Sequence, residues 1–330
     1  MNSSRRGFMA SAAAFGAYVG LEKPLYMIPE ANAQGAWKGE PGQTLMDKGF
    51  HKFRVGDIEV ITVYDGRADA PIDPAFIPGT TADEIKAALV KGGHKGDIRP
   101  NFFTVTFVRM KGKTIMFDSS TGGQLAATAG RMMARNMYAA GIDPQQISSI
   151  VVTHYHADHI SGMISPATNS KAFPDAEIIV PEAEQKFWTD ESLPTRMPEN
   201  MRGIITRIQA SLGKWKNVRQ VKADTEVLPG IRAVDTNAHT PGHTSYLITS
   251  GKSQLMVLGD VTNIPAINVA NPNWSIGFDY DKPKAAEVRK RIFDRAIADK
   301  IIMTGYHWGM PGAGTVRKDG NGYAYIPVRT

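Results

Sequence analysis

The sequence predicts an α/β fold in which sheets are stacked face to face and helices cover them on the outside. Short runs rich in Val, Ile, Phe or Thr recur along the chain, each bounded by Gly, Pro, Asp or Asn, and such runs are typical of strands. The early runs come as hairpin-like pairs and the later ones alternate with helical patterns, which favours layered sheets. The 330 residues, 42% of them hydrophobic, show no break in composition, so we expect one domain over residues 34–330.

The expected elements follow from these runs and from apolar periodicity. Strands are predicted over residues 58–63, 102–108, 114–117, 149–153, 177–180, 230–234, 246–249, 254–258 and 300–303. Helices are predicted over 123–140, 182–188, 200–212 and 283–298, the last with an apolar face of 3.6-residue period. Residues 71–81 and 189–199 are rich in Pro and polar side chains, and we expect surface loops there that shape the mouth of a pocket.

The first 33 residues are predicted to be a removable signal peptide. Arg5 and Arg6 precede a short apolar stretch, residues 9–21, and Ala31-Asn32-Ala33 forms a small-x-small cleavage site. The paired arginines indicate the twin-arginine export route, which predicts a periplasmic protein. The alternative is a buried N-terminal helix with a chance arginine pair. No apolar run is long enough to span a bilayer, so no membrane partner is expected for the mature form.

Charge and cysteine content narrow the classes of function. The formal net charge is +6 with a pI near 9.3, but the basic residues are scattered rather than gathered into a stripe. We therefore expect no nucleic-acid partner. The chain has no cysteine, so no thiolate can act as nucleophile or metal ligand. Any transition-metal site must be built from His, Asp and Glu, which favours metals such as zinc.

Four of the candidate metal ligands fall within six residues. The apolar run that ends at Thr153 is followed by His154, His156, Asp158 and His159. On an extended chain, positions i and i+2 face the same side, so His154 and His156 can share one metal. A turn after His156 would then direct Asp158 and His159 toward a neighbouring point. A single histidine is commonly structural, but this cluster predicts a metal centre.

Three further candidates each follow a probable strand or a tight turn. His243 lies in the turn His239-Thr240-Pro241-Gly242-His243, Asp260 ends the run 255–260, and His307 follows the apolar run 301–306. Ligands at strand ends are held by a rigid sheet, as metal geometry requires. The chain thus offers five histidines and two aspartates.

These motifs carry a family resemblance. T-H-Y-H-A-D-H at 153–159, H-T-P-G-H-T at 239–244, L-G-D at 258–260 and G-Y-H at 305–307, in that order, resemble the metallo-β-lactamase superfamily. The resemblance implies an αββα sandwich with a dinuclear zinc site at one edge of the two sheets. It implies a first metal on His154, His156 and His243, a second on Asp158, His159 and His307, and Asp260 as the bridge. It assigns supporting, non-ligand roles to Asp118 and His239. His51 and His94 match no motif and are expected at the surface, with a peripheral metal site as the alternative.

A dinuclear site of this kind predicts hydrolysis. Two metals about 3.5–4 Å apart lower the pKa of a shared water toward about 7, and the resulting hydroxide attacks the substrate. Asp158 and Asp260, as metal ligands, are the candidate catalytic residues. The ligand set suits two Zn²⁺ ions but would also accept Mn, Co or Fe.

The substrate class is argued from departures within the family. Two features argue against true β-lactamases: the chain has no cysteine, and it has Asp260 in the bridging position. The short stretch of chain after His307 argues against glyoxalase II types. RNA-processing relatives are disfavoured because no RNA-binding arm is found. What remains resembles exported organophosphate hydrolases and lactonases, and within them the chlorothalonil-type hydrolytic dehalogenases, which implies replacement of an aromatic chlorine by hydroxyl. A small aromatic or neutral organic substrate would need an apolar pocket. Trp308 and Met310 are the candidates for it, with ordinary core residues as the alternative.

Two other functions stay open. The first is a phosphotriesterase or lactonase that uses the same two metals. The second is a periplasmic protein that stores or senses zinc without turnover. The resemblance also implies a homodimer, which is common among such relatives.

Overall fold

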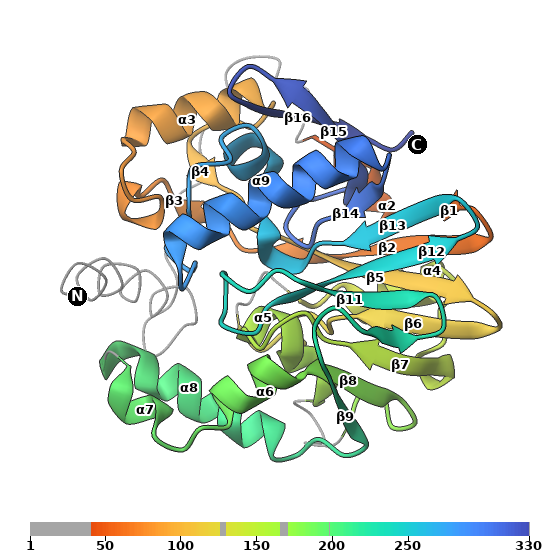
Figure 1. Ribbon diagram of the computed structural model, residues 1–330. Helices are drawn as coiled ribbons and strands as arrows, with labels where there is room; N and C mark the ends of the chain where they lie inside the picture. Colours follow the sequence, from red (N-terminus) through yellow and green to blue (C-terminus); the bar gives the residue numbers. More distant parts are fainter. Residues whose placement is uncertain (1–40, 126–129, 166–170, 198, 330) are drawn as a thin grey trace.

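The computed structural model describes residues 41–125, 130–165, 171–197 and 199–329, so the predicted signal peptide at 1–33 lies outside the described residues. Within them, two seven-stranded sheets form the centre of the molecule, with a separate two-stranded sheet beside them. Helix α9 lies on one side of the strands and helices α6 to α8 lie on the other (Figure 1). No helix among these residues is long and apolar enough to cross a membrane.

The strand order of each sheet follows its hydrogen-bonded neighbours. The first sheet consists, in spatial order, of β1 (Phe50–Val55), β2 (Ile58–Arg67), β5 (Phe102–Met110), β6 (Lys113–Phe117), β7 (Ile147–Val151), β8 (Glu177–Pro181) and β9 (Val218–Val221). The second consists of β10 (Glu226–Leu228), β11 (Ile231–Asp235), β12 (Thr244–Ser250), β13 (Ser253–Val257), β14 (Ile302–Thr304), β15 (Ala313–Asp319) and β16 (Gly322–Pro327). The two-stranded sheet pairs β3 (Ala70–Pro71) with β4 (Ile98–Arg99).

Helices and short turns connect these strands. The α-helices are α2 (Gln43–Lys48), α3 (Ala82–Lys91), α4 (Met133–Ala139), α5 (Ala157–Ile160), α6 (Glu182–Trp188), α7 (Leu193–Arg196), α8 (Glu199–Leu212) and α9 (Lys282–Ala298). The short turns are η1 (Pro74–Phe76), η2 (Pro144–Gln146), η3 (Ser161–Met163), η4 (Gly259–Val261) and η5 (Pro265–Val269), of which η5 is π-helical.

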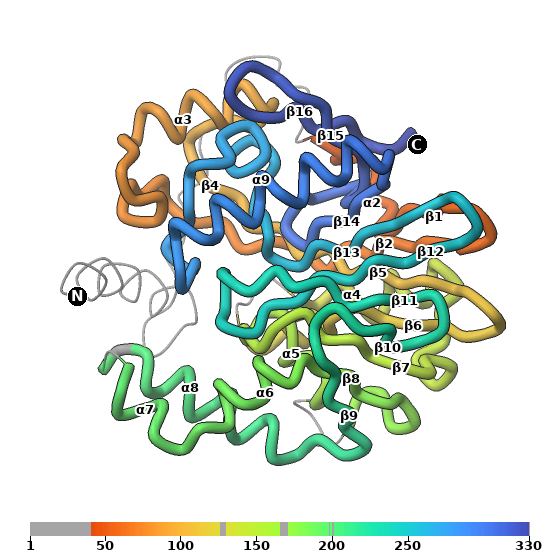
Figure 2. The backbone as a smooth tube through the Cα atoms, in the orientation of Figure 1, coloured from red at the N-terminus to blue at the C-terminus, as the bar shows by residue number. Residues whose placement is uncertain are grey.

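Alternating side chains bury both faces of each sheet. In β12, Tyr246 and Ile248 enter the core between the sheets, whereas Leu247 enters the core beneath α9. In the first sheet, Val60 of β2 faces the second sheet, and Val63 faces the helices. This period of two is that of a strand, and burial on both faces explains the nearly continuous apolar runs. Strands β11 to β13 accordingly lie beside β5 to β7 (Figure 2). The layers are helix, sheet, sheet, helix, which confirms the predicted αββα sandwich.

Strand directions bring the ends of several strands to one edge. Strand β6 pairs in parallel with β7, and β13 pairs in parallel with β14. Strand β11 runs antiparallel to β12, which runs antiparallel to β13, so β11 and β13 end on the same side. The segments that follow β6, β7, β11, β13 and β14 carry the predicted site residues. The sheets therefore deliver these residues to a common edge.

Two predicted elements differ from the structure. The helix expected over 123–140 is reduced to α4, Met133–Ala139, with residues 126–129 outside the described part. Gly122, Gly123 and Gly130 have positive φ angles of 58°, 70° and 77°, which no right-handed helix allows. The segment expected to be a loop at 189–199 contains helix α7. Pro194 does not prevent this helix, because it lies in the first turn, where proline is compatible with a helix.

A buried carboxylate joins the first sheet to α4. Asp65 of β2 accepts hydrogen bonds from the backbone N–H groups of Met132 (2.9 Å) and Met133 (2.5 Å), and its other oxygen accepts from the Ser120 hydroxyl. The side chain is inaccessible to solvent. Burial raises the pKa of Asp65 to about 6, and the hydrogen bonds of Ser120, Met133 and Met132 oppose that rise.

We predict that Asp65 makes folding stability depend on pH. Its folded pKa, about 6, lies above its ordinary 3.8, so its contribution is complete below about pH 3.8 and is lost as the pH rises to about 6. This difference between the folded and ordinary pKa values corresponds to roughly 3 kcal/mol in the free energy of unfolding. Urea unfolding of the wild type and of Asp65→Asn between pH 4 and pH 7 should show the wild type losing stability relative to the variant. A gap between the two proteins that stays constant over this range would contradict the prediction.

Candidate metal centre

The clustered motif places two histidines and then a helical turn at the end of β7. His154 and His156 lie in the segment between β7 and α5, with the Nε2 atom of His154 3.1 Å from Nδ1 of His156. His156 has an extended backbone and caps α5, which then carries Asp158 and His159. The predicted change of direction after His156 is therefore a short helix. It turns Asp158 and His159 toward the same region as the two preceding histidines.

Three groups of side chains could each hold a metal ion. Within each group, the candidate ligand atoms all lie within 4.8 Å of one another. The groups are His154, His156 and His239; His154, His159 and Asp260; and Asp158, His159 and His307. The side chains come from segments that follow β7, β11, β13 and β14, and all of them are buried.

The carboxylate of Asp260 lies between these groups. Its Oδ1 atom is 3.3 Å from Nε2 of His159, and its Oδ2 atom is 3.3 Å from Nε2 of His239 and 3.2 Å from Nε2 of His307. Oδ2 thus lies beside His239 of the first group, and the two oxygens together lie beside His159 and His307 of the third group. A bridging carboxylate requires this position.

The structure corrects the expected roles of the two histidines in the H-T-P-G-H-T turn. The first histidine, His239, points Nε2 at Nδ1 of His156, 3.0 Å away, and completes the first group. Both nitrogens of the second, His243, bind protein atoms: Nε2 accepts from the backbone N–H of Asp260 (2.9 Å) and Nδ1 lies 2.9 Å from the Thr236 hydroxyl. His243 therefore supports Asp260, and His239 rather than His243 lies in the first group of candidate ligands, where the family resemblance placed His243.

Three of the candidate histidines, His159, His239 and His307, are each oriented through the nitrogen that faces away from the centre. The Nδ1 atom of His159 lies 2.8 Å from the Asp118 carboxylate, and that of His307 lies 2.7 Å from the Phe102 carbonyl oxygen. Nδ1 of His239 lies 2.8 Å from Asp279. Such outer partners set the tautomer and leave Nε2 to bind metal. Asp118, which was expected to have a supporting, non-ligand role, is the outer partner of His159.

Glu184 was not singled out from the sequence, yet it ties together two motifs. Its carboxylate accepts from the backbone N–H of Tyr155 (2.9 Å) in the first motif, and from the Thr240 hydroxyl (2.7 Å) and the backbone N–H of Gly242 (3.0 Å) in the second. A Cβ atom at Gly242 would lie 2.1 Å from the Glu184 nitrogen, so only glycine allows this approach. Neither Glu184 nor Asp279 has a local sequence signal, because both act through tertiary contacts.

Burial and charge give the histidines different proton affinities. Burial, with the neighbouring His159 and His156, lowers the pKa of His154 well below its ordinary value. Burial, with His239, does the same for His156. At His159 burial alone would lower the pKa, but the carboxylates of Asp260, Asp158 and Asp118 raise it well above its ordinary value. The negative potential that attracts a proton to His159 would also attract a metal cation.

The residues present fit a divalent metal. Nε2 of His159 and Oδ1 of Asp260 are buried and have no hydrogen-bond partner among the described residues. Buried polar atoms nearly always have a partner, and a cation would supply one to both. The donors are imidazole nitrogens and carboxylate oxygens, a set that divalent transition metals accept. Together these observations support divalent metal use.

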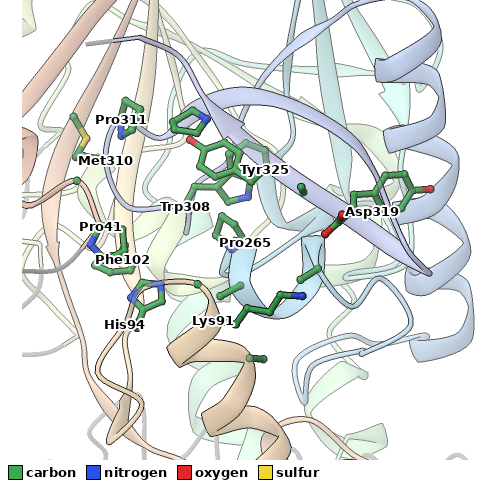
Figure 3. A pocket seen from close by; sticks show the side chains of 18 of the residues that line it. Pro41, Lys91, His94, Phe102, Pro265, Trp308, Met310, Pro311, Asp319 and Tyr325 are labelled. Atoms are coloured by element: carbon green, nitrogen blue, oxygen red, sulfur yellow. The ribbon is translucent and has the colours of Figure 1, made fainter.

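Trp308 and Met310, the expected substrate-pocket residues, line a different cavity. This cavity of about 1410 Å³ is bounded by Phe102, Pro265 and Tyr325 as well (Figure 3). None of the candidate ligands is among its described lining residues. Trp308 also donates to the Thr262 hydroxyl at 2.7 Å and belongs to the core beneath α9. The described lining of this cavity therefore includes both side chains but none of the candidate ligands.

The two histidines outside the motifs have different surroundings. His51 was expected at the surface, but it is buried in β1, because the side chain packs against Phe53. Burial lowers the pKa of His51, and Lys48 adds to that effect. His94 is half-buried and lines the cavity beside Phe102. Neither belongs to a group of candidate ligands within the described part of the chain.

We predict different consequences for the two histidines of the turn. His239→Ala should lower affinity for one bound cation by at least about 100-fold, because a ligand should count for more than an outer partner. His243→Ala should lower the cation affinity less, by about 10-fold, because its contact with the site is a hydrogen bond to the Asp260 backbone. Metal analysis after dialysis against graded chelator concentrations measures both. Greater loss in His243→Ala than in His239→Ala would contradict the placement.

Comparison with solved structures shows the same fold in several hydrolases. AidC, described as a dizinc quorum-quenching lactonase, is similar with a TM-score of 0.79 and 24% identity, covering 86% of this chain and 98% of that one. The hydrolase AbOPH is similar with a TM-score of 0.78 and 22% identity over the same shares. A probable metal-dependent hydrolase from Staphylococcus aureus has a TM-score of 0.66 and 18% identity, covering 84% and 99%. At these identities the likeness concerns the fold alone.

Sequence comparison adds curated relatives and a family. N-acyl homoserine lactonases of Bacillus sp. and Bacillus cereus are each 29% identical over 165 residues, which is 49% of this chain and 56% of each relative. The chain thus spans little more than half the length of these relatives. The family model of the metallo-beta-lactamase superfamily matches residues 99–300, which contain every candidate ligand except His307. With its two-sheet sandwich and its edge cluster of histidines and aspartates, the chain belongs to the metallo-β-lactamase superfamily.

Proposed function

We propose that the chain is a hydrolase that uses two divalent cations, most naturally zinc, to open lactones or related neutral esters. The observation that carries the proposal is the Asp260 carboxylate, buried between two groups of imidazoles. In this assignment His154, His156 and His239 would hold the first cation, Asp158, His159 and His307 would hold the second, and the Asp260 carboxylate would serve both. Geometry of this kind suits a two-metal hydrolase better than a zinc store, which needs no shared carboxylate.

The chain's own residues prepare the site for this chemistry. When bound, the cations would act as Lewis acids that polarise the substrate and activate water. Burial favours the neutral form of His154 and His156, so their lone pairs are available for ligation. The ring of Tyr306 packs against that of His159 with centroids 3.9 Å apart and a tilt of 33°, and its hydroxyl donates to the backbone carbonyl of Asp158 at 2.6 Å. Tyr306 thereby holds Asp158 and shields His159 from water.

Exposure indicates the side from which substrate arrives. His154 and His159 are inaccessible, whereas His156 and Asp158 keep 8% and 9% of their surface exposed. The ring of His156 lies 6.0 Å from that of Trp188 and 6.5 Å from that of Phe278. Substrate would approach beside Phe278, which is half-buried, whereas Trp188, the other aromatic neighbour, is buried. Phe278 would contact the apolar part of the substrate, as expected for a neutral organic molecule.

Lactone hydrolysis is the first candidate because two independent comparisons include lactonases. In that reaction the oxygen of water bonds to the carbonyl carbon, the ring C–O bond breaks, and the ring oxygen takes a proton to give a hydroxy acid. The reaction needs no further cofactor. With cations bound, the candidate centre would supply positive charge where the carbonyl oxygen becomes negative.

Hydrolytic dehalogenation of a chlorinated aromatic nitrile is the second candidate. Phe278, the half-buried aromatic neighbour of His156, favours it, because its ring could stack on a flat ring. Here the oxygen of water bonds to the ring carbon, chloride leaves with the electron pair of the C–Cl bond, and one proton is released. Chloride needs no proton to depart, so no general acid is required.

Location and assembly belong to the same proposal. The paired arginines and the Ala31-Asn32-Ala33 site support export of the folded protein to the periplasm. Insertion of metal before export would suit that route. We also propose a homodimer that acts on small molecules, without nucleic acid or membrane as partner.

A three-substrate assay tests the proposed function. Purified protein should hydrolyse an N-acyl homoserine lactone faster than a parathion-type triester or a chlorinated aromatic dinitrile, measured as acid, nitrophenol and chloride release. Asp260→Ala should lose at least about 100-fold in rate while keeping its circular dichroism spectrum. Chelation should abolish turnover, and zinc, manganese or cobalt should restore it.

The outcomes separate the candidates. Faster chloride release than lactone hydrolysis would assign the protein to dehalogenation. Turnover of none of the three substrates, or full activity in Asp260→Ala, would contradict a two-metal hydrolase.

A further inference from the structure

We propose that Arg289 is a positioning residue of the metal centre, through two separate arms. One arm reaches His239 through Asp279, and the other holds the backbone that carries Asp260. The inference rests on the proposed function only in taking His239 and Asp260 as ligands. Arg289 itself touches neither side chain.

Arg289 occupies a place where a charge is normally excluded. It lies on the inner face of α9, four residues from Ala285 and four from Phe293, both buried. Only 1% of Arg289 is exposed. A buried guanidinium is costly unless its donors are satisfied, and here they are. Nε donates to the Val261 carbonyl oxygen (2.8 Å), while Nη1 donates to those of Pro272 (2.8 Å) and Trp274 (3.1 Å).

The first arm orients His239. Nη2 of Arg289 lies 3.5 Å from Oδ2 of Asp279, and Oδ1 of Asp279 lies 2.8 Å from Nδ1 of His239. Asp279 is further held by the backbone N–H of Ile276, which donates to Oδ2 at 3.0 Å. A carboxylate in this position keeps the proton of His239 on Nδ1, so Nε2 presents its lone pair to the centre. Nε2 indeed faces Nδ1 of His156 at 3.0 Å and Oδ2 of Asp260 at 3.3 Å.

The main chain strengthens this arm. The backbone N–H of Tyr280 donates to the carbonyl oxygen of His239, and that of Asp281 donates to the carbonyl oxygen of Ala238, both at 3.0 Å. The two segments are therefore joined by backbone and side chain together. A shift of Asp279 would move His239 with it.

The second arm fixes the turn around Asp260. This residue lies in η4 with a non-helical backbone, φ −102° and ψ 30°. Its own N–H donates to His243 (2.9 Å), and the carbonyl oxygen of the next residue, Val261, accepts from Arg289 (2.8 Å). The peptide unit before Asp260 and the one after Val261 are thus held. One guanidinium therefore links supports of two ligands that follow different strands, β11 and β13.

The chemistry of this position selects arginine over lysine. The guanidinium group directs its donors in a plane toward acceptors on opposite sides, and here it reaches three carbonyl oxygens and one carboxylate. A lysine ammonium group could approach Asp279 or Val261, but it cannot span both. We expect Arg289→Lys to restore only part of the function that Arg289→Met removes.

Cadmium-113 NMR tests the proposal without relying on activity. The cadmium-loaded wild type should give one resonance for each of two cations. Arg289→Met should shift or broaden the resonance of the cation held by His239 most strongly and lower that cation's affinity by about 10- to 100-fold, measured by chelator competition. The other cation should be affected less, because Arg289 reaches it only through the backbone that carries Asp260. Arg289→Lys should be intermediate. Asp118→Asn should instead perturb the other resonance, because Asp118 orients His159.

Arg291→Met is the matched control. Arg291 lies on the same helix, but it is exposed and its guanidinium donates to the Asp235 carbonyl oxygen. This variant should keep both resonances and both affinities. If Arg289→Met fails to fold, Asp279→Asn, which keeps the size of the side chain, can replace it. This variant should still selectively perturb the cadmium resonance of the cation held by His239.

The outcomes are distinct from those of the proposed function. Wild-type protein that binds fewer than two cations would overturn the centre and the positioning role with it. A second outcome is that the wild type binds two cations while Arg289→Met leaves both resonances and both affinities unchanged. That result would overturn only the role of Arg289. Where Arg289→Met is unfolded, the same result in Asp279→Asn would do so. Equal loss of both cations in Arg289→Met would also overturn it, because that result indicates general destabilisation.

Discussion

A buried carboxylate surrounded by imidazoles is the interaction on which the site depends. Asp260 is 5% exposed, and its oxygens lie 3.2–3.3 Å from nitrogens of His159, His239 and His307. Burial alone would raise the pKa of Asp260, but His307 and His159 lower it well below its ordinary value. An ionised carboxylate in this place needs positive charge beside it. Metal cations would supply that charge, and the same cations would provide the chemistry of hydrolysis.

The layered fold was predictable because its strands are buried on both faces and therefore read as apolar runs. Helix α6 was predicted with the bounds that it has, Glu182–Trp188. The hairpin of β15 and β16 was missed because its strands carry exposed polar residues, such as Arg317 and Lys318. Helix α3 was also missed, although Thr81 and Glu84 form a capping box that marks its beginning.

The site was predictable where its residues are close in sequence and less so where they meet only in the fold. The run from His154 to His159 identified the centre, but choosing between His239 and His243 needed the position of Asp260, whose N–H occupies His243. Gly259 explains how they come so close: a Cβ atom there would lie 2.7 Å from Nε2 of His243. Outer partners such as Asp279 are separated from the residues they orient by dozens of positions. Among these supporting residues, only Arg289 stands out in the sequence, as a charged residue on the apolar face of a predicted helix.

Anomalous X-ray scattering from crystals grown with zinc tests the central claim most directly. Difference maps from data collected on both sides of the zinc absorption edge should show two peaks flanking the Asp260 carboxylate. One should lie about 2.0–2.1 Å from nitrogens of His154, His156 and His239, and the other at similar distances from the ligands carried by α5 and from His307. A map with no peak beside Asp260, or with peaks held by other side chains, would contradict the account.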